Sequence, residues 1–146
     1  MDGILAVVAP TEADVELLEE AGTVAAATGV DVVVLALAIE ENDHASIDAM
    51  RGWEGFEDSM GDTPHDFADH LGGVTLAPRG VEYIPVGERV DATRPSEKII
   101  DVARNHGCDH IYVLNRSRSP AGKALFGDTT QSVILNFDGF VTVRTP

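Results

Sequence analysis

Three short apolar runs constrain the fold of this chain more than any other feature. Residues 4–9 are uninterrupted and end before Pro10, residues 30–39 are rich in β-branched side chains, and residues 110–114 form a third run. Each run has the length of one strand and is too apolar for a strand with one face in water. Strands buried on both faces are typical of parallel sheets covered by helices, so the runs predict an α/β fold.

Helix signals lie between these runs. Thr11 is placed to cap a helix that Gly29 can end in a left-handed conformation, and Asp14 stands three residues after the cap, as in a capping box. Residues 95–106 have their apolar side chains on one helical face. A shorter helix is expected at about residues 129–137, after a loop.

The middle and the end of the chain give weaker signals. Glycines punctuate residues 40–80, where Thr63 and Pro64 favour a helix that runs to about residue 71. Residues 81–86 are expected to form a short strand, and Phe140–Arg144 a last one.

The alternation of strands and helices predicts one doubly wound domain over residues 1–146, with a five-stranded, mainly parallel sheet and helices on both faces. A chain of 146 residues suits one domain. In this architecture ligands bind beyond the carboxyl ends of the strands, where the strand order reverses. We therefore expect a site at the loops after the first and fourth strands.

The charge is strongly negative and unevenly distributed. The net charge is -15; residues 1–75 hold 17 acidic and one basic residue, and residues 76–146 hold 8 acidic and 9 basic ones. Nucleic acids and anionic membranes attract basic surfaces, so neither is an expected partner. The first half is most simply a solvated acidic face.

The composition also bears on the compartment. No apolar run is long enough to span a membrane, and Cys108 is the single cysteine, so we expect a cytoplasmic protein. The chain has 14 Asp and only two Lys, which resembles proteins of salt-loving microbes. In about 1 M salt the screening length falls to about 3 Å, so such a surface repels itself little.

The segment over residues 109–134 reads DHIYVLNRSRSPAGKALFGDTTQSVI. It resembles the nucleotide loop of the universal stress protein family, in which spaced glycines lead to a Gly-Ser or Gly-Thr pair that opens a helix. The segments ILAVVAPTE, VDVVVLALAIE, RPSEKIIDVARNHGC and GFVTVRT agree with the family in order and spacing. The resemblance covers almost the whole chain and, with its acidity, suggests a member of the haloarchaeal type.

The resemblance implies the universal stress protein fold, which is like that of adenine-nucleotide α-hydrolases, and ATP or a related adenine nucleotide with Mg²⁺ as the ligand. It also implies a homodimer through the strand Phe140–Arg144. A helix N-terminus and nearby cations suit phosphates. The residues expected around the ligand are Pro10, Thr11, Leu37, Asn115, Arg116, Arg118, Lys123, Gly127, Asp128, Thr129 and Thr130.

The chain departs from the family's pattern at diagnostic positions. Asn115 and Arg118 stand where the family has loop glycines, and Ala9 stands where it has an aspartate. Two functions therefore stay open: a regulatory nucleotide-binding protein, or a nucleotide-free dimeric stress or interaction module. No residue is identified as a catalytic base or nucleophile, so ATP hydrolysis is expected to be weak at most.

Asp128 replaces the family's hydroxyl residue and has two readings. With Gln131 three residues on, it suits an N-cap worth about 1 kcal/mol. Its carboxylate would also face a bound phosphate, and two unit charges 4 Å apart near a surface repel by about 4 kcal/mol. The basic residues of the loop either offset this repulsion or merely balance an acidic protein.

Four neighbouring residues have side chains that bind metals. His106, Cys108, Asp109 and His110 span a helix end and a strand start, so they are expected to project in different directions. No metal site is predicted there.

Overall fold

A computed structural model of the chain describes residues 2–39, 43–91, 94–116 and 126–145. Two short 3-10 helices, η2 (Asp58–Met60) and η3 (Ala77–Arg79), lie on either side of the helix α3 (Pro64–Thr75). The main elements, in chain order, are β1 (Ile4–Val8), α1 (Glu12–Thr28), β2 (Val32–Ile39), α2 (Asp43–Arg51), α3 (Pro64–Thr75), β3 (Tyr83–Val90), α4 (Pro95–Asn105), β4 (His110–Leu114), α5 (Asp128–Asn136) and β5 (Phe140–Arg144).

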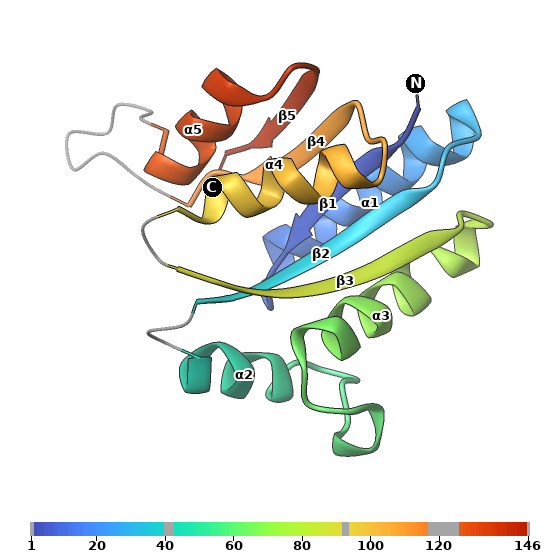
Figure 1. The fold of residues 1–146 in the computed structure, drawn as a ribbon. Helices are drawn as coiled ribbons and strands as arrows, with labels where there is room; N and C mark the ends of the chain where they lie inside the picture. Colours follow the sequence, from blue (N-terminus) through green and yellow to red (C-terminus); the bar gives the residue numbers. More distant parts are fainter. Residues whose placement is uncertain (1, 40–42, 92–93, 117–125, 146) are drawn as a thin grey trace.

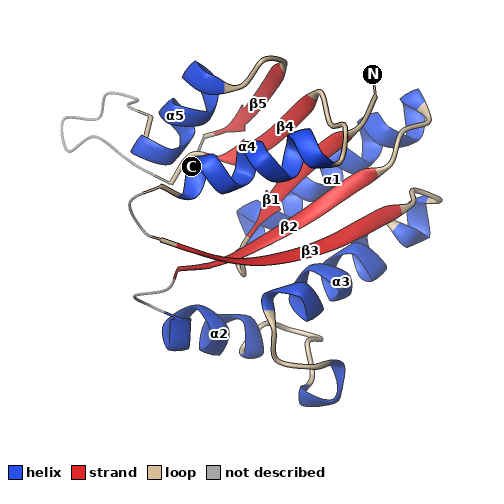
Figure 2. Cartoon of the chain, in the orientation of Figure 1, coloured by secondary structure: helices blue, strands red, loops and turns tan. Residues whose placement is uncertain are grey.

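The five strands form one sheet in the order β3-β2-β1-β4-β5, and every neighbouring pair is parallel (Figure 2). This confirms the predicted α/β fold, and the sheet is parallel throughout. The chain builds outward from β1 to β3 on one side and then crosses to β4 and β5 on the other. The order thus reverses between β1 and β4, which is where doubly wound folds bind ligands.

Helices cover both faces of the sheet, α1 and α3 on one and α4 and α5 on the other (Figure 1). Successive residues of β1 point to opposite faces, so Ile4 belongs to the core beside α1 and Leu5 to the core beside α4. Both are fully buried. This explains why the first strand is apolar without interruption. Among the described helices, none is both long and apolar enough to cross a membrane.

The helix α3 begins as predicted but ends later. The Thr63 side chain accepts a hydrogen bond from the Asp66 amide, and the Asp66 carboxylate accepts one from the Thr63 amide. Pro64 is the first residue of the helix. The helix then continues through its glycines to Thr75 rather than ending near residue 71. The cause is close packing: a Cβ on Gly72 would lie 2.3 Å from the Tyr83 ring, so glycine lets β3 and α3 touch.

The strand β3 is also longer than predicted, because its pairing with β2 extends to Val90. Its second half contains Gly87, Glu88 and Arg89, residues that do not read as a buried strand. An edge strand needs no continuous apolar run, so these residues are compatible with β structure here. No limits were predicted for α2, and the limits predicted for the other helices and strands lie within two residues of the observed ones.

Candidate functional site

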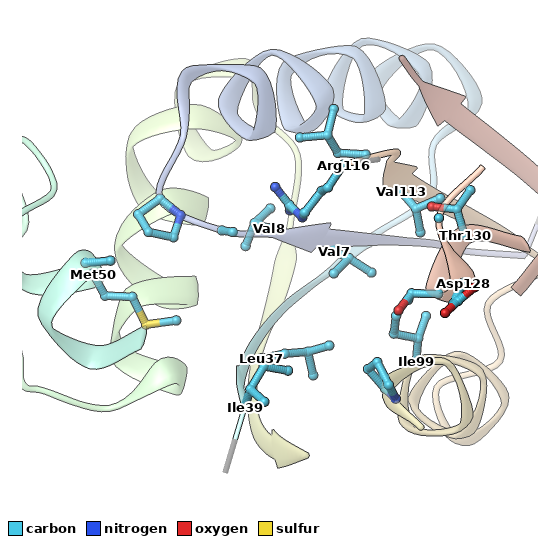
Figure 3. Close-up of a pocket in the computed structure, with 17 residues that line it drawn as sticks. Val7, Val8, Leu37, Ile39, Met50, Ile99, Val113, Arg116, Asp128 and Thr130 are labelled. Carbon is cyan, nitrogen blue, oxygen red and sulfur yellow. The ribbon is translucent and has the colours of Figure 1, made fainter. Parts of the chain in front are cut away.

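A cavity of about 570 Å³ lies beyond the carboxyl ends of β1, β2 and β4 (Figure 3). Its volume falls within the range of about 300–1,000 Å³ that is usual for small-molecule sites. Most of its wall is apolar, and Figure 3 shows Leu37 and Ile39 on one side and Met50 opposite Ile99. The α5 helix begins at its edge. An apolar cavity with a few polar groups at one end suits a ligand with a flat apolar part and a polar part.

The residues predicted around a ligand divide into three groups. Thr11 and Asn115 are not among the residues that line the cavity, and Arg118 and Lys123 fall outside the described residues. The predicted residues that line the cavity are Pro10, Leu37, Arg116, Gly127, Asp128, Thr129 and Thr130.

Arg116 lines the cavity but is already paired. Its Nη2 donates to Asp14 Oδ1 at 2.6 Å and its Nη1 to Asp14 Oδ2 at 3.1 Å. The Asp14 side chain is fully buried, whereas that of Arg116 is 46% exposed. This two-pronged ion pair ties the chain after β4 to the first turn of α1. The guanidinium charge is therefore largely neutralised before any ligand binds.

Thr11 also contacts the Asp14 member of this ion pair. As predicted, it caps α1, because its hydroxyl oxygen accepts from the Asp14 amide at 3.2 Å. The hydroxyl also donates to the Asp14 carboxylate, in place of the backbone bond of a full capping box. Thr11 thus orients Asp14 and does not reach the cavity wall.

Asp14 does more than the predicted capping of α1, because it also pairs with Arg116. A signal was available: Asp14 precedes Leu18, Ala21 and Ala25 by four, seven and eleven residues, and all three are buried. That spacing places Asp14 on the core face of α1. A buried carboxylate needs a hydrogen-bonded or oppositely charged partner, so this pattern predicts a cationic side chain close to Asp14 in the folded chain.

Asn115 takes a structural role where the family has a loop glycine. Its side chain is buried, and its Oδ1 accepts from the Gly127 amide at 3.0 Å. Its own backbone amide donates to the Arg144 carbonyl at 2.9 Å. Asn115 therefore joins the two ends of the loop and connects them to β5. Because the Gly127 amide donates to Asn115, it is not available to donate to a bound anion.

Of the two readings of Asp128, the N-cap reading is wrong. Gly127 holds the cap position in an extended conformation, its carbonyl accepts from the Gln131 amide at 2.9 Å, and no side chain caps the helix. Asp128 is already the first helical residue, so it cannot fill the preceding cap position. Its exposed carboxylate borders the cavity instead, on the same side as Thr130 in Figure 3.

Outside the cavity, the described residues offer neither a metal site nor a reactive thiol. No group of three or more His, Cys, Asp or Glu side chains is placed there to hold a metal ion. Burial raises the pKa of the Cys108 thiol to about 11, so the reactive thiolate is scarce at neutral pH. His110 lies at the amino end of β4, away from the cavity, where its ring stacks on Tyr112 and burial lowers its pKa.

The family model described as "Universal stress protein family" matches residues 1–143. A comparison with curated protein sequences finds no match.

Solved structures of universal stress proteins share the fold. One from Archaeoglobus fulgidus is 21% identical, with 98% of this chain and 97% of that one covered and a TM-score of 0.65. A universal stress protein in complex with cAMP is 15% identical, covers 98% and 96%, and has a TM-score of 0.67. A universal stress protein structure from Archaeoglobus fulgidus in complex with dAMP is 17% identical, covers 98% and 96%, and has a TM-score of 0.61.

Proposed function

Because the chain belongs to the universal stress protein family, we propose that it is a regulatory stress-response protein that binds ATP or a related adenine nucleotide in the cavity beyond β1, β2 and β4. The single observation that carries this proposal is the position of a mainly apolar cavity at the reversal of the strand order. Structures of similar fold were solved with cAMP and with dAMP, which favours an adenine ligand.

In this proposal the adenine lies against the apolar wall at Leu37, and the ribose lies between this wall and the first turn of α5. The phosphates point toward the first turn of α5, whose amides have no side-chain cap. Mg²⁺ would accompany a triphosphate and would give the Asp128 carboxylate a cation to contact.

Purification without added ligand tests the proposal. The denatured protein should release an adenine compound, or titration at high salt with Mg²⁺ should reveal binding of adenosine, AMP or ATP. If no adenine compound is released and none binds, the nucleotide-free dimeric module becomes the better description. The commitment of Arg116 to Asp14 is the observation that favours this second function.

Filling the cavity should block the ligand. We expect Leu37→Trp to weaken binding of the best adenine ligand at least about tenfold, because the indole takes the space of the base. Ile84→Trp is the matched control, since Ile84 is 41% exposed on β3 and is not part of the cavity wall. Calorimetric titration of both folded variants measures the effect; equal affinities would place the ligand elsewhere.

We also propose a homodimer through β5. This strand is last in the sheet order, so one of its edges pairs with no strand of the described chain, and Phe140 on it is 66% exposed. An unpaired edge beside an exposed aromatic ring suits a second copy related by a twofold axis.

Phe140→Arg should convert this dimer to a monomer, because two like charges would meet across the axis. Light scattering after gel filtration should give twice the 15.5 kDa chain mass for the unaltered protein and the single mass for the variant. Val74→Arg, at a 57% exposed site on α3, should stay dimeric. A monomeric unaltered protein would refute the proposal.

The acidity supports a further part of the proposal, that the protein works in a salt-rich cytoplasm. Raising KCl from 0.1 to 2 M should increase the melting temperature by about 5–10 °C, because screening removes repulsion among charges that sum to -15. Thermal unfolding followed by circular dichroism measures this shift. A melting temperature independent of KCl would argue against adaptation to salt.

A further inference from the structure

We infer that the cavity prefers an uncharged adenine nucleoside to the corresponding triphosphate, and that the Asp128 carboxylate accepts hydrogen bonds from the sugar hydroxyls. This inference rests on the proposed binding of an adenine ligand and specifies which part of that ligand the protein recognises. It follows from the charges, the donors and the shape of the described wall.

The charges of the wall do not favour a chain of phosphates. Within the described part of the wall, the charged residues are Arg116 and Asp128. The Nη1 and Nη2 atoms of Arg116 both donate to the buried Asp14 carboxylate, so the ion pair as a whole carries almost no net charge. Among the described residues of this wall, the Asp128 carboxylate is thus the charge that no other residue neutralises. Each phosphate added to a ligand near it adds like-charge repulsion.

The hydrogen-bond donors of the wall are also partly used. The Gly127 amide donates to Asn115 Oδ1, so it is occupied before a ligand arrives. The next amides belong to the first turn of α5, where Asp128 itself is the first residue. A carboxylate in the first turn already complements the positive end of the helix dipole. The terminus therefore offers a second anion less stabilisation than an uncharged first turn would.

The same carboxylate fits a sugar. An ionised Asp is an acceptor only, and two neighbouring hydroxyls are the matching donors. Acidic residues bind ribose hydroxyls in this way in dinucleotide-binding folds. Thr129, half-exposed beside Asp128, has a hydroxyl that can both donate and accept. The apolar wall at Leu37 and Ile39 suits the base, so the described site complements a nucleoside from end to end.

Titration calorimetry in one buffer should compare adenosine, AMP and ATP, the last with and without Mg²⁺. We expect adenosine to bind at least about tenfold more tightly than ATP, with AMP between them. We expect 2′-deoxyadenosine or 3′-deoxyadenosine to bind about threefold to tenfold more weakly than adenosine, because a donor to Asp128 is lost.

Asp128→Ala should remove both preferences. Its affinity for ATP should rise, its affinity for adenosine should fall, and adenosine should no longer be distinguished from its deoxy forms. Asp138→Ala is the matched control, since it makes the same charge change at an exposed turn residue that is not part of the cavity wall. The deoxynucleoside comparison on the unaltered protein stands even if the Asp128 variant folds poorly.

The outcomes separate this inference from the proposed function. Tighter binding of ATP than of adenosine would overturn the inference and leave the proposed function supported. Equal binding of adenosine and both deoxy forms would overturn the role of Asp128 as a sugar acceptor. Binding of none of the adenine compounds would overturn the proposed function, and the inference would fall with it.

Discussion

Arg116→Met is expected to lower the free energy of unfolding by about 2–4 kcal/mol. The variant would leave the Asp14 carboxylate fully buried without its guanidinium partner. Removing one member of a buried ion pair costs about 3–5 kcal/mol. We expect somewhat less here because the Arg116 side chain is 46% exposed, so water can reach part of the vacated space. Urea unfolding at constant salt measures the change.

Two further variants show whether the loss comes from burial of Asp14. Arg144→Met removes a pair with Glu16 whose side chains are 35% and 61% exposed, and it should cost less than about 1 kcal/mol. The double variant Arg116→Met with Asp14→Leu should recover at least half of the loss, because no charge stays buried. A loss below about 0.5 kcal/mol for Arg116→Met alone would contradict this account.

The ion pair also joins the two loops that form the cavity. Asp14 lies in the helix that follows β1, and Arg116 lies two residues after β4. These strands are neighbours at the reversal of the sheet order. The pair therefore fixes the spacing of the two loops, and its loss should weaken ligand binding as well as stability.

Burial on both faces is what made the inner strands predictable. The runs at β1, β2 and β4 are apolar because side chains on either side of the sheet are covered, so local composition carries the tertiary information. The edge strand β5 also matched its predicted limits. The second half of β3 could not be predicted, since its β structure depends on pairing with β2 rather than on its own residues.

The sequence was enough to predict where the candidate site lies, but not which residues meet there. The rule that ligands bind where strand order reverses placed it at the loops after β1 and β4, and the cavity lies there. The wall also includes Met50 from α2 and Ile99 from α4, which reach the site only through helix packing. The bond between Asp14 and Arg116 joins residues 102 positions apart, a pairing that only the folded chain reveals.

The close contact of β3 with α3 gives the second large effect. A Cβ on Gly87 would lie 2.0 Å from the backbone nitrogen of His65 and 2.6 Å from its Cα. These are backbone atoms in the first turn of α3, so no side-chain rotation can make room. Gly87→Ala should therefore push α3 from the sheet and lower the free energy of unfolding by about 3 kcal/mol, at the upper end of typical overpacking.

Gly52→Ala is the matched control, since the atom nearest to its new Cβ would be the Asp48 carbonyl oxygen at an ordinary 3.5 Å. It should change the free energy of unfolding by less than about 0.5 kcal/mol. Equal urea midpoints for the two variants would show that α3 moves away from the sheet at little cost in free energy.

If Gly87→Ala is destabilising as expected, ligand affinity should fall too, because α2 packs beside α3 and holds Met50 against the cavity. The glycine would then matter to the site as well as to the fold, through the position of the helices that close one side of the cavity.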